Sequence, residues 1–358
     1  MKINHNNLLN IAFNIAKINL GKTNLNPSVG CVVVKNQSVI SSGFTSLNGR
    51  PHAEFNALNK KKNFKNSDLY VTLEPCTHYG KTPPCTKIIG KKGIKKVIYS
   101  FNDIDQRTAK KSKNELIKKK IIVHRKFNKK FVDFYKSYFY SKKQDLPYID
   151  AKIAISKDFF SINKKSKWIT NSLSRKRGHL IRSEYDAILT TSKTINTDNA
   201  QLNCRINGLN PNKPDLIIVD LDLKINKKLQ ILKKNNKRKI VIVTSVRKNS
   251  KYNYLKRKNV KFIRIKNLYN KDDFIALLKN LKKKNYSRIL IETGLIFINE
   301  LFKYKLIENL YVFQSSSKLK KNGKNNISNR FLRELKLKNR VKVNLGNDNL
   351  YKLKLANV

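Results

Sequence analysis

Residues 52–58 read HAEFNAL, and residues 74–85 read EPCTHYGKTPPC. The first stretch places a histidine and a glutamate two residues apart at an expected helix start, and the second contains two of the four cysteines of the chain. A catalytic zinc ion needs three protein ligands and a fourth position left open. One imidazole and two thiolates, from His52, Cys76 and Cys85, are such a ligand set. The two stretches therefore predict a metal site.

The residues around these ligands favour the same interpretation. Pro51 suits the first position of a helix, and Pro83 and Pro84 predict a helix start leading into Cys85, where the helix terminus lowers the pKa of a thiol. Glu54 is the expected proton carrier, because a carboxylate beside a metal-activated water can pass a proton to a leaving amine. H-x-E followed by P-C and a second cysteine is the pattern of zinc deaminases. Taken separately, each piece has a plainer explanation, as an ordinary helix start or as buried thiols.

Apolar runs alternate with helical patterns along the whole chain, which predicts mixed sheets covered on both faces. A chain of 358 residues favours two domains. Pro147 disfavours helix at the residue before it and marks the boundary, giving an expected deaminase domain at 1–145 and a second α/β domain at 146–358. Residues 340–358 are expected to form a β-hairpin that turns near Gly346. Cys31 lies in an apolar strand and is expected in the core.

Several stretches, in order along nearly the whole chain, resemble the bifunctional deaminase–reductases of riboflavin biosynthesis. In the first half these are NPSVGCVVV (26–34), HAE (52–54) and TLEPCTHYGKTPPC (72–85); in the second they are PYIDAKIAIS (147–156), WIT (168–170), DAILTTSKTINTD (186–198) and IETG (291–294). The resemblance implies a cytidine-deaminase-like three-layer domain with a mixed sheet, followed by a dihydrofolate-reductase-like α/β domain.

The implied reactions are two consecutive steps on a phosphorylated pyrimidine. The first is zinc-dependent hydrolytic deamination of 2,5-diamino-6-(5-phosphoribosylamino)pyrimidin-4-one, with His52, Cys76 and Cys85 as zinc ligands and Glu54 as proton donor. The second is NADPH-dependent reduction of the ribosyl side chain to ribityl. Asn26 has two open interpretations, as a contact to the pyrimidine base or as a turn-forming residue.

The resemblance also assigns residues of the reductase half. Those matching substrate-contacting positions are Ser166, Arg182, Leu202, Arg205 and Glu292. Those matching cofactor-contacting positions are Ala154, Trp168, Thr194, Asp198 and the loop Thr293, Gly294, Leu295, Ile296, Phe297, Ile298 and Asn299. The strand–glycine–helix junction at 292–295 can bind phosphate at a helix N-terminus, although an ordinary turn has the same pattern. Arg175 and Arg182 share a helix face suited to phosphate or carboxylate, or form a solvated basic face.

Departures from the family pattern keep two alternatives open. Phe159 and Phe160 stand where a glycine and a basic residue are usual, and Asn199-Ala200 replaces Asp-Pro. One alternative is therefore a deaminase whose second half is only a scaffold. The other is a zinc deaminase acting on nucleic acid, which the net charge of +55 suggests. The eight residues between Cys76 and Cys85 argue against it, because such enzymes commonly have P-C-x-x-C.

Composition predicts the setting of the enzyme. The lysines are spread along the chain together with abundant Asn and Ile, which favours a codon bias over a nucleic-acid surface. No apolar run reaches the length of a membrane span, and four cysteines do not make a disulfide scaffold in a chain of this length. We therefore expect a cytoplasmic protein with no specific nucleic-acid or membrane partner. A homo-oligomer, a dimer or tetramer, is a separate expectation that does not follow from composition.

Overall fold

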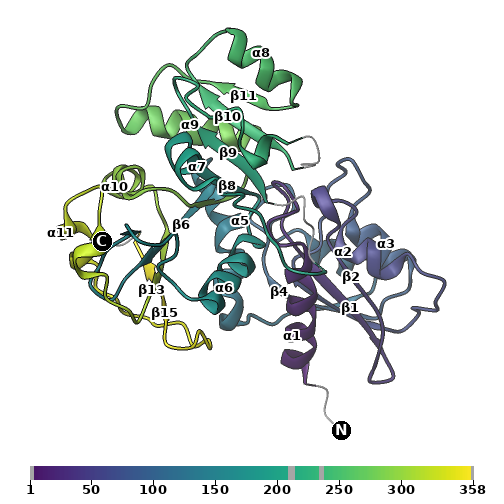
Figure 1. Cartoon of the computed structure of the whole chain (residues 1–358). Coiled ribbons are helices and arrows are strands. Elements are labelled where there is room, and N and C mark those ends of the chain that lie inside the picture. Colours follow the sequence, from purple (N-terminus) through teal and green to yellow (C-terminus); the bar gives the residue numbers. More distant parts are fainter. Residues whose placement is uncertain (1–3, 209–213, 234–237, 356–358) are drawn as a thin grey trace. The chain divides into compact units, whose positions relative to one another are not determined.

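The computed structural model describes residues 4–208, 214–233 and 238–355, and the chain separates into two compact units, 1–145 and 146–358 (Figure 1). Each unit has one main sheet covered by helices. The expected two-domain α/β architecture is confirmed. Within the described ranges, no helix is long and apolar enough to cross a membrane.

The first unit contains a five-stranded mixed sheet in the order β2-β1-β3-β4-β5, in which β1 is antiparallel to both neighbours and β3, β4 and β5 are parallel. Its elements are α1 (His5–Ala16), β1 (Gly30–Lys35), β2 (Ser38–Phe44), α2 (Ala53–Leu58), β3 (Asp68–Leu73), α3 (Cys85–Lys91), β4 (Lys96–Phe101), α4 (Ser112–Ile117), β5 (Ile122–Arg125) and α5 (Val132–Gln144).

Alternate residues of β1 serve opposite faces of this sheet, as the two-residue period of a strand requires. Val32 packs with Leu9 and Ala12 of α1 on one face. Cys31 packs with helices on the other face and has no exposed surface, as expected for a core thiol. The sheet is thus the middle of three layers, and the predicted metal ligands lie after the end of β3 and at the starts of α2 and α3.

The second unit contains an eight-stranded sheet in the order β11-β10-β9-β8-β12-β6-β13-β15, parallel except for β15. Its elements are β6 (Tyr148–Ile155), β7 (Ile162–Asn163), α6 (Ser172–Arg182), β8 (Ala187–Thr191), α7 (Ser192–Asp198), β9 (Asp215–Val219), β10 (Ile240–Thr244), α8 (Ser250–Arg257), β11 (Lys261–Arg264), α9 (Lys271–Lys283), β12 (Arg288–Ile291), α10 (Leu295–Lys303), β13 (Asn309–Gln314), β14 (Gly323–Lys324), α11 (Asn329–Glu334) and β15 (Asn349–Lys354).

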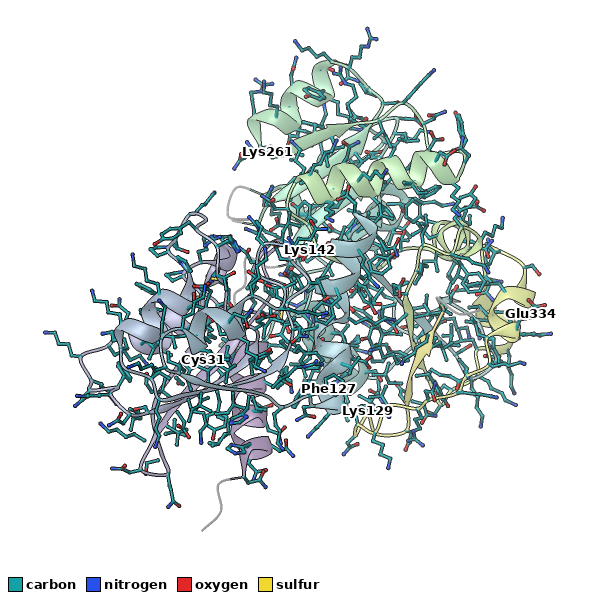
Figure 2. The ribbon with its side chains drawn as sticks, turned by 180° about the vertical axis from the view of Figure 1, so that it is seen from behind. Cys31, Phe127, Lys129, Lys142, Lys261 and Glu334 are labelled. Carbon is teal, nitrogen blue, oxygen red and sulfur yellow. The ribbon has the colours of Figure 1, made fainter. Side chains whose placement is uncertain are left out.

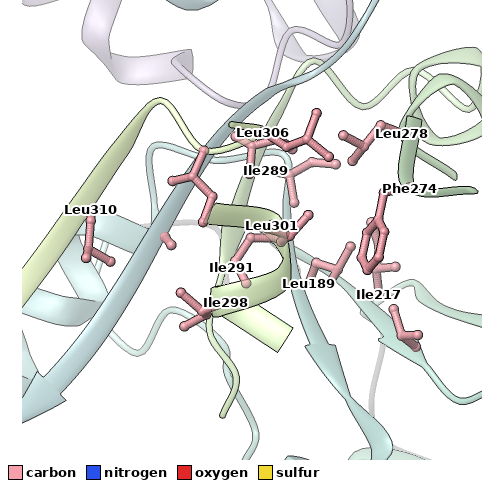
Figure 3. Close-up of a cluster of buried hydrophobic side chains, with 14 of the residues drawn as sticks. Leu189, Ile217, Phe274, Leu278, Ile289, Ile291, Ile298, Leu301, Leu306 and Leu310 are labelled. Carbon is pink, nitrogen blue, oxygen red and sulfur yellow. The ribbon is translucent and has the colours of Figure 1, made fainter. Parts of the chain in front are cut away.

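Buried aliphatic residues hold this sheet to its helices. Ile217 and Ile289 of the strands contact a cluster that includes Phe274 of α9 and Leu301 of α10 (Figure 3). Parallel strands covered on both faces need such continuous apolar sequence. Their carboxyl ends meet at one edge of the sheet, where ligands of open α/β sheets bind.

The structure corrects two local predictions. Residues 340–348 contain no strand, only bridges from Arg340 to Tyr351 and from Leu345 to Asn347, and β15 pairs with β13 over six residues. The expected hairpin is therefore present only as a short antiparallel contact across the turn near Gly346, in which the Val341 amide donates to the Leu350 carbonyl at 2.8 Å; its residues 356–358 lie outside the described part. Pro51 is not the first helical residue: α2 begins at Ala53, and His52 is its N-cap.

Exposed lysines occur in both units, among them Lys129 and Lys142 in the first and Lys261 in the second (Figure 2). This distribution agrees with charge spread along the sequence.

Candidate active sites

Three side chains from separate elements form the candidate metal centre of the first unit. Atoms of His52, Cys76 and Cys85 all lie within 4.8 Å of one another. The Nδ1 atom of His52 is 3.5 Å from Sγ of Cys76 and 3.4 Å from Sγ of Cys85. Tetrahedral bonds of about 2.0 Å to nitrogen and 2.3 Å to sulfur would separate these atoms by about 3.5 Å. The donor set therefore fits a zinc ion without rearrangement.

Local structure explains how the ligands meet. His52 is the N-cap residue of α2, Cys76 lies three residues after the end of β3, and Cys85 is the first residue of α3, directly after Pro84. The Cys85 amide donates to Sγ of Cys76 at 3.2 Å. Hydrogen bonds from the Cys85 thiol and from His52 lower the pKa of Cys76 to about 4. The site therefore favours a thiolate, the form that binds metal.

Glu54 lies beside the ligands in the first turn of α2 and is only 4% exposed. Burial raises the pKa of its carboxyl to about 7, and the charge of Cys76 acts in the same direction. A carboxyl group with a pKa near neutrality can both accept and donate a proton. Its place therefore suits the proton-carrying role expected from the sequence.

A second acidic residue, which the sequence interpretation missed, shapes the surroundings of the metal centre. The Glu74 carboxylate accepts hydrogen bonds from the amides of Asp103, Lys110 and Ser112 at 3.1–3.2 Å. These bonds draw the segment 103–112 against the loop between the two cysteines. There Thr77 Oγ1 donates to the Arg107 carbonyl, and His78 Nδ1 lies 3.0 Å from Thr108 Oγ1. The sequence did not reveal this role of Glu74, because the three amides that it binds lie about 30 to 40 residues further along the chain.

Asn26 is linked to the turn that precedes the histidine ligand. Its amide donates to the Gly49 carbonyl at 3.3 Å, and Gly49 has φ +86°. An added Cβ at Gly49 would meet the Asn26 side chain at 2.3 Å, so the close approach requires glycine there. The turn-stabilising role of Asn26 is thus present, whereas its predicted base contact stays a prediction.

In the second unit, the structure brings together two of the predicted substrate residues. The Glu292 carboxylate, just after β12, accepts hydrogen bonds from Arg182 Nε at 2.5 Å and Arg182 Nη2 at 2.9 Å. Lys152 of β6 lies 3.4 Å from the same carboxylate. The pair of Arg175 and Arg182 does not converge on one anion, because Arg175 donates to the Thr170 carbonyl and stacks on Trp168.

The predicted cofactor residues at the ends of β8 and β12 also meet. Thr194 Oγ1 is 3.0 Å from Thr293 Oγ1 and accepts from the Gly294 amide at 3.3 Å. An added Cβ at Gly294 would have no atom within 4 Å, so the start of α10 is open to a ligand. Residues 295–299, expected in a loop, form the first turns of α10 instead, and Leu295 and Ile298 are buried in the core, so they can present only backbone atoms.

The remaining predicted residues lie on loops and strand ends around this edge. Trp168 is 52% exposed, and its amide donates to Ser166 Oγ at 3.1 Å. Lys167 connects this loop to Asp198 by donating to its carbonyl at 2.6 Å. Ala154 is partly buried in β6. The other predicted cofactor residues after Gly294 lie in α10: Ile296 is exposed, and Phe297 and Asn299 are partly buried.

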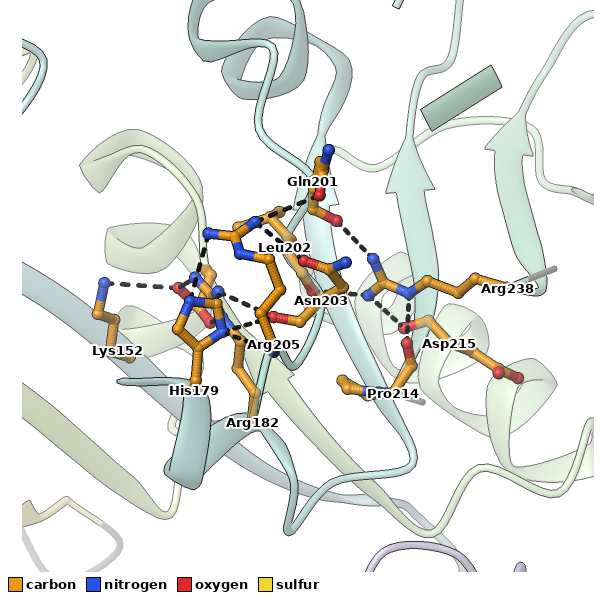
Figure 4. Close-up of polar contacts among 11 residues, drawn as sticks. Lys152, His179, Arg182, Gln201, Leu202, Asn203, Arg205, Pro214, Asp215 and Arg238 are labelled. Atoms are coloured by element: carbon orange, nitrogen blue, oxygen red, sulfur yellow. Dashed lines mark hydrogen bonds and ion pairs between the residues drawn. The ribbon is translucent and has the colours of Figure 1, made fainter. Parts of the chain in front are cut away.

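The segment 201–205, which carries the predicted residues Leu202 and Arg205, is held by two side chains that sequence reasoning missed (Figure 4). His179 of α6 contacts the Asn203 carbonyl and Arg205. Arg238 is 6% exposed and donates to the carbonyls of Gln201 and Leu202 on the segment and to those of Pro214 and Asp215. His179 lies three residues before Arg182 on α6 and therefore on the same helix face, which could have identified it as a neighbour of the substrate residues. Nothing in the local sequence indicated a role for Arg238.

Comparisons with known proteins assign a different family domain to each of the two units. Residues 2–101 match the cytidine and deoxycytidylate deaminase zinc-binding region, and residues 147–351 match the RibD C-terminal domain. Riboflavin biosynthesis protein RibD of Buchnera aphidicola is 31% identical over 313 residues, covering 84% of each chain. The Aquifex aeolicus protein of the same name is 31% identical over 86% of this chain and 85% of its own.

Solved structures extend the similarity to the whole fold. Acinetobacter baumannii RibD matches with a TM-score of 0.82 and 25% identity over 98% of both chains. A Thermotoga maritima diaminohydroxyphosphoribosylaminopyrimidine deaminase/5-amino-6-(5-phosphoribosylamino)uracil reductase matches with a TM-score of 0.81, also at 25% identity over 98% of both chains.

A zinc-binding deaminase domain followed by a reductase domain defines a bifunctional deaminase–reductase. Matches to both domains, and relatives that share nearly a third of their residues over most of the chain, narrow the class to one family. The chain belongs to the RibD family of riboflavin biosynthesis, whose cofactors are zinc for the deaminase and NADPH for the reductase.

Proposed function

We propose that the first unit deaminates 2,5-diamino-6-(5-phosphoribosylamino)pyrimidin-4-one at the centre formed by His52, Cys76 and Cys85. The observation that carries this proposal is the pair of 3.4–3.5 Å distances from His52 to both sulfurs, with buried Glu54 beside them. Zinc bound there supplies a Lewis acid that activates water. Glu54 would take one proton of that water and give it to the ring nitrogen, and would then pass the second proton of the same water to the departing amine.

Paired variants test these roles by metal analysis and ammonia release. Glu54→Gln keeps the shape of the side chain but cannot carry the proton, so we expect bound zinc with ammonia release reduced by at least about a hundredfold. Cys85→Ser should lose the metal as well. Cys31→Ala, a core thiol of the same unit, is the matched control and should retain zinc. Full deamination by Glu54→Gln would rule out the role given to that residue.

We propose that the second unit reduces the deaminated product, with Arg182, Arg205, Leu202, Ser166 and Glu292 around the substrate. Arg182 is neutralised by Glu292, whereas Arg205 is exposed and donates to neutral acceptors among the described residues. Arg205 is therefore the cation available to the substrate phosphate. NADPH bound near Trp168, Thr194 and Gly294 supplies the hydride, while the chain orients the sugar carbon toward it.

Backbone geometry at the divergent positions supports a working reductase over a scaffold. Phe159 has φ +65° in place of the family's glycine, and Asn199 has φ +44° at the end of α7. A left-handed conformation costs a residue such as Phe about 1–2 kcal/mol. Packing of Phe159 against the large core cluster offsets that cost. The loops therefore keep a glycine-like path despite the changed residues.

We further propose a cytoplasmic homo-oligomer, a dimer or tetramer, without a specific nucleic-acid partner. None of the four cysteines forms a disulfide and all are buried, which fits a reducing compartment. Sedimentation at several protein concentrations tests the oligomer, and a monomer at every concentration would contradict it. A filter-binding salt series tests the nucleic-acid alternative, which needs sequence or structure preference that persists at moderate salt.

A further inference from the structure

The side chain of His179 bridges two positions of the segment that presents Arg205 (Figure 4). His179 Nδ1 is 2.9 Å from the Asn203 carbonyl oxygen, and Nε2 is 3.3 Å from Arg205 Nη2. A guanidinium only donates, so Nε2 must accept, and the proton of a neutral ring then sits on Nδ1 and points to the carbonyl. In this tautomer the Arg205 amide, 3.3 Å from Nδ1, makes no hydrogen bond to the ring, because both groups are donors. In the other tautomer, the Nε2 hydrogen would face the Arg205 guanidinium, so that two donors meet. The bare Nδ1 atom would face the Asn203 carbonyl oxygen, so that two acceptors meet.

We propose that His179 is a positioning residue of the reductase, whose neutral imidazole holds the Arg205 guanidinium in the orientation that receives the substrate phosphate. The proposal rests on the phosphate-binding role given to Arg205 above. Two side-chain acceptors on the same segment share the task, since Arg205 Nη1 donates to Gln201 Oε1 at 3.3 Å and to Asn203 Oδ1 at 3.1 Å. Within the described ranges, His179 is the residue of α6 that contacts the Nη2 atom.

Arg238 strengthens the argument, because it makes the backbone of the segment rigid. Its guanidinium donates to Gln201 O at 2.5 Å and Leu202 O at 2.7 Å, from a position that is 6% exposed. Leu202 itself has φ +48°, a strained conformation for a leucine. With the backbone held there, the remaining freedom of Arg205 is mainly that of its long side chain, and this is the freedom that His179 restricts.

Protonation of His179 would reverse the contact. An imidazolium carries a hydrogen on Nε2, which would face the Arg205 guanidinium instead of accepting from it. Burial lowers the pKa of His179 from 6.5, and the charges of Arg182 and Arg205 lower it further, against smaller raising effects from the Asn203 carbonyl and Glu292. The neutral ring is therefore the resting form at neutral pH.

The charged surroundings of the imidazole come from four elements. Arg182 shares α6 with His179, and its Nη1 atom is 3.5 Å from Nδ1. Arg205 and the buried thiol of Cys204 lie on the segment, Glu292 follows β12, and Lys152 of β6 pairs with Glu292. Among these groups the net charge is positive at neutral pH, so a further proton on His179 is opposed by all the nearby cations. The release of Arg205 should accordingly occur only below pH 6.5.

Steady-state reductase kinetics of the full-length enzyme, with NADPH and the deaminated phosphoribosyl substrate, test the proposal. His179→Phe should raise KM for that substrate about tenfold, the value of one hydrogen bond to a charged group, with KM for NADPH unchanged. The increase should be absent with the dephosphorylated ribosyl substrate. His179→Gln keeps an acceptor near Nε2 and should restore most of the affinity. Lys176→Gln, on the exposed side of the same helix, is the matched control.

The pH profile gives the readout that a merely structural role would not produce. In the unaltered enzyme, KM for the phosphorylated substrate should rise as pH falls below 6.5, and in His179→Gln the rise should be smaller, because only the substrate phosphate, whose second pKa is about 6, then titrates. A wild-type KM in His179→Phe, or the same profile in His179→Gln as in the unaltered enzyme, would overturn the proposal. Arg205→Ala distinguishes phosphate binding by Arg205 from its positioning by His179. If Arg205→Ala also leaves KM unchanged, Arg205 does not bind the phosphate and the proposed function fails at this residue. If Arg205→Ala raises KM while His179→Phe does not, only the positioning role of His179 fails.

Discussion

Arg182 and Glu292 form a two-pronged ion pair, with Nε–Oε1 and Nη2–Oε2 distances of 2.5 and 2.9 Å. They lie on α6 and just after β12, and the Glu292 side chain is only 6% exposed. A planar guanidinium matched to a carboxylate in this way fixes both side chains. The relationship joins a helix face to the carboxyl edge of the sheet, where the proposed substrate and cofactor residues meet.

Loss of this carboxylate should destabilise the second unit. Glu292→Gln leaves Arg182 buried without its counter-charge, and removing one partner of a buried pair costs about 3–5 kcal/mol in the free energy of unfolding. Denaturant unfolding at neutral pH measures the change. Glu300→Gln, which breaks an exposed pair with Lys303 on α10, should change stability by less than about 1 kcal/mol. Equal effects of the two substitutions would contradict the importance of the buried pair.

The stabilising effect of Glu292 should depend on pH in a defined direction. Burial alone would raise the pKa of the carboxyl, but the charges of Arg182 and Lys152 and their hydrogen bonds outweigh it and lower the pKa to about 2, from 4.5. Because the folded pKa is the lower one, the stabilisation is present above 4.5 and is lost as pH falls toward 2. The stability difference between the unaltered protein and Glu292→Gln should therefore shrink over that interval. A constant difference there would show that the carboxylate acts by packing alone.

Release of the segment 103–112 is expected when Glu74 is changed. Glu74→Gln removes a charged acceptor of three backbone amides, and bonds to a charged group are worth about 1.5–3 kcal/mol each when lost. Hydrogen exchange at Asp103, Lys110 and Ser112 should speed up, while α1 stays protected. Glu115→Gln, an exposed change on α4, is the control. Unchanged exchange at the three amides would mean that other contacts hold the segment.

NADPH should change the fluorescence of the protein through its only tryptophan. Trp168 is half exposed and stacks on Arg175 with 4.6 Å between the guanidinium carbon and the ring centroid. Tryptophan emission overlaps nicotinamide absorption, so binding nearby should quench it along a saturable curve. Trp168→Phe provides the blank. A linear titration without saturation would instead favour the scaffold interpretation of the second half.

Metal removal should affect one activity and spare the other. Chelation leaves His52 and the two thiolates without a common partner, so ammonia release should fall to background and the thermal midpoint of the first unit should drop. Reduction of the deaminated substrate, supplied directly, should persist, because the reductase residues belong to a separate core. Adding zinc back should restore ammonia release. Loss of both activities on chelation would contradict independent sites.

Short-range chemistry was readable from the chain alone. The sequence alone predicted the candidate metal site and its proton carrier, because the types and order of the ligands can be recognised before the fold is known. The residues are His52, Glu54, Cys76 and Cys85. The strand and helix pattern was equally readable, since alternation and apolar runs reflect local periodicity. The segment 340–358 shows the limit of such reasoning: the expected hairpin is reduced to a short antiparallel contact at Arg340 and Tyr351, whereas the six-residue pairing of β15 with β13 has no signal in the local sequence.

Sequence by itself determined the family, the two α/β halves and the four residues of the candidate deaminase centre, because these depend on local order and residue type. Tertiary structure decided which distant groups are in contact. Arg182 donates to the Glu292 carboxylate, His179 contacts the Arg205 guanidinium, and Arg238 donates to the Leu202 carbonyl. Partners so far apart are brought together by the sheet order, and hydrogen-bond geometry at about 3 Å has no signature in local sequence. Orientation of the reductase arginines is therefore a property of the fold as a whole.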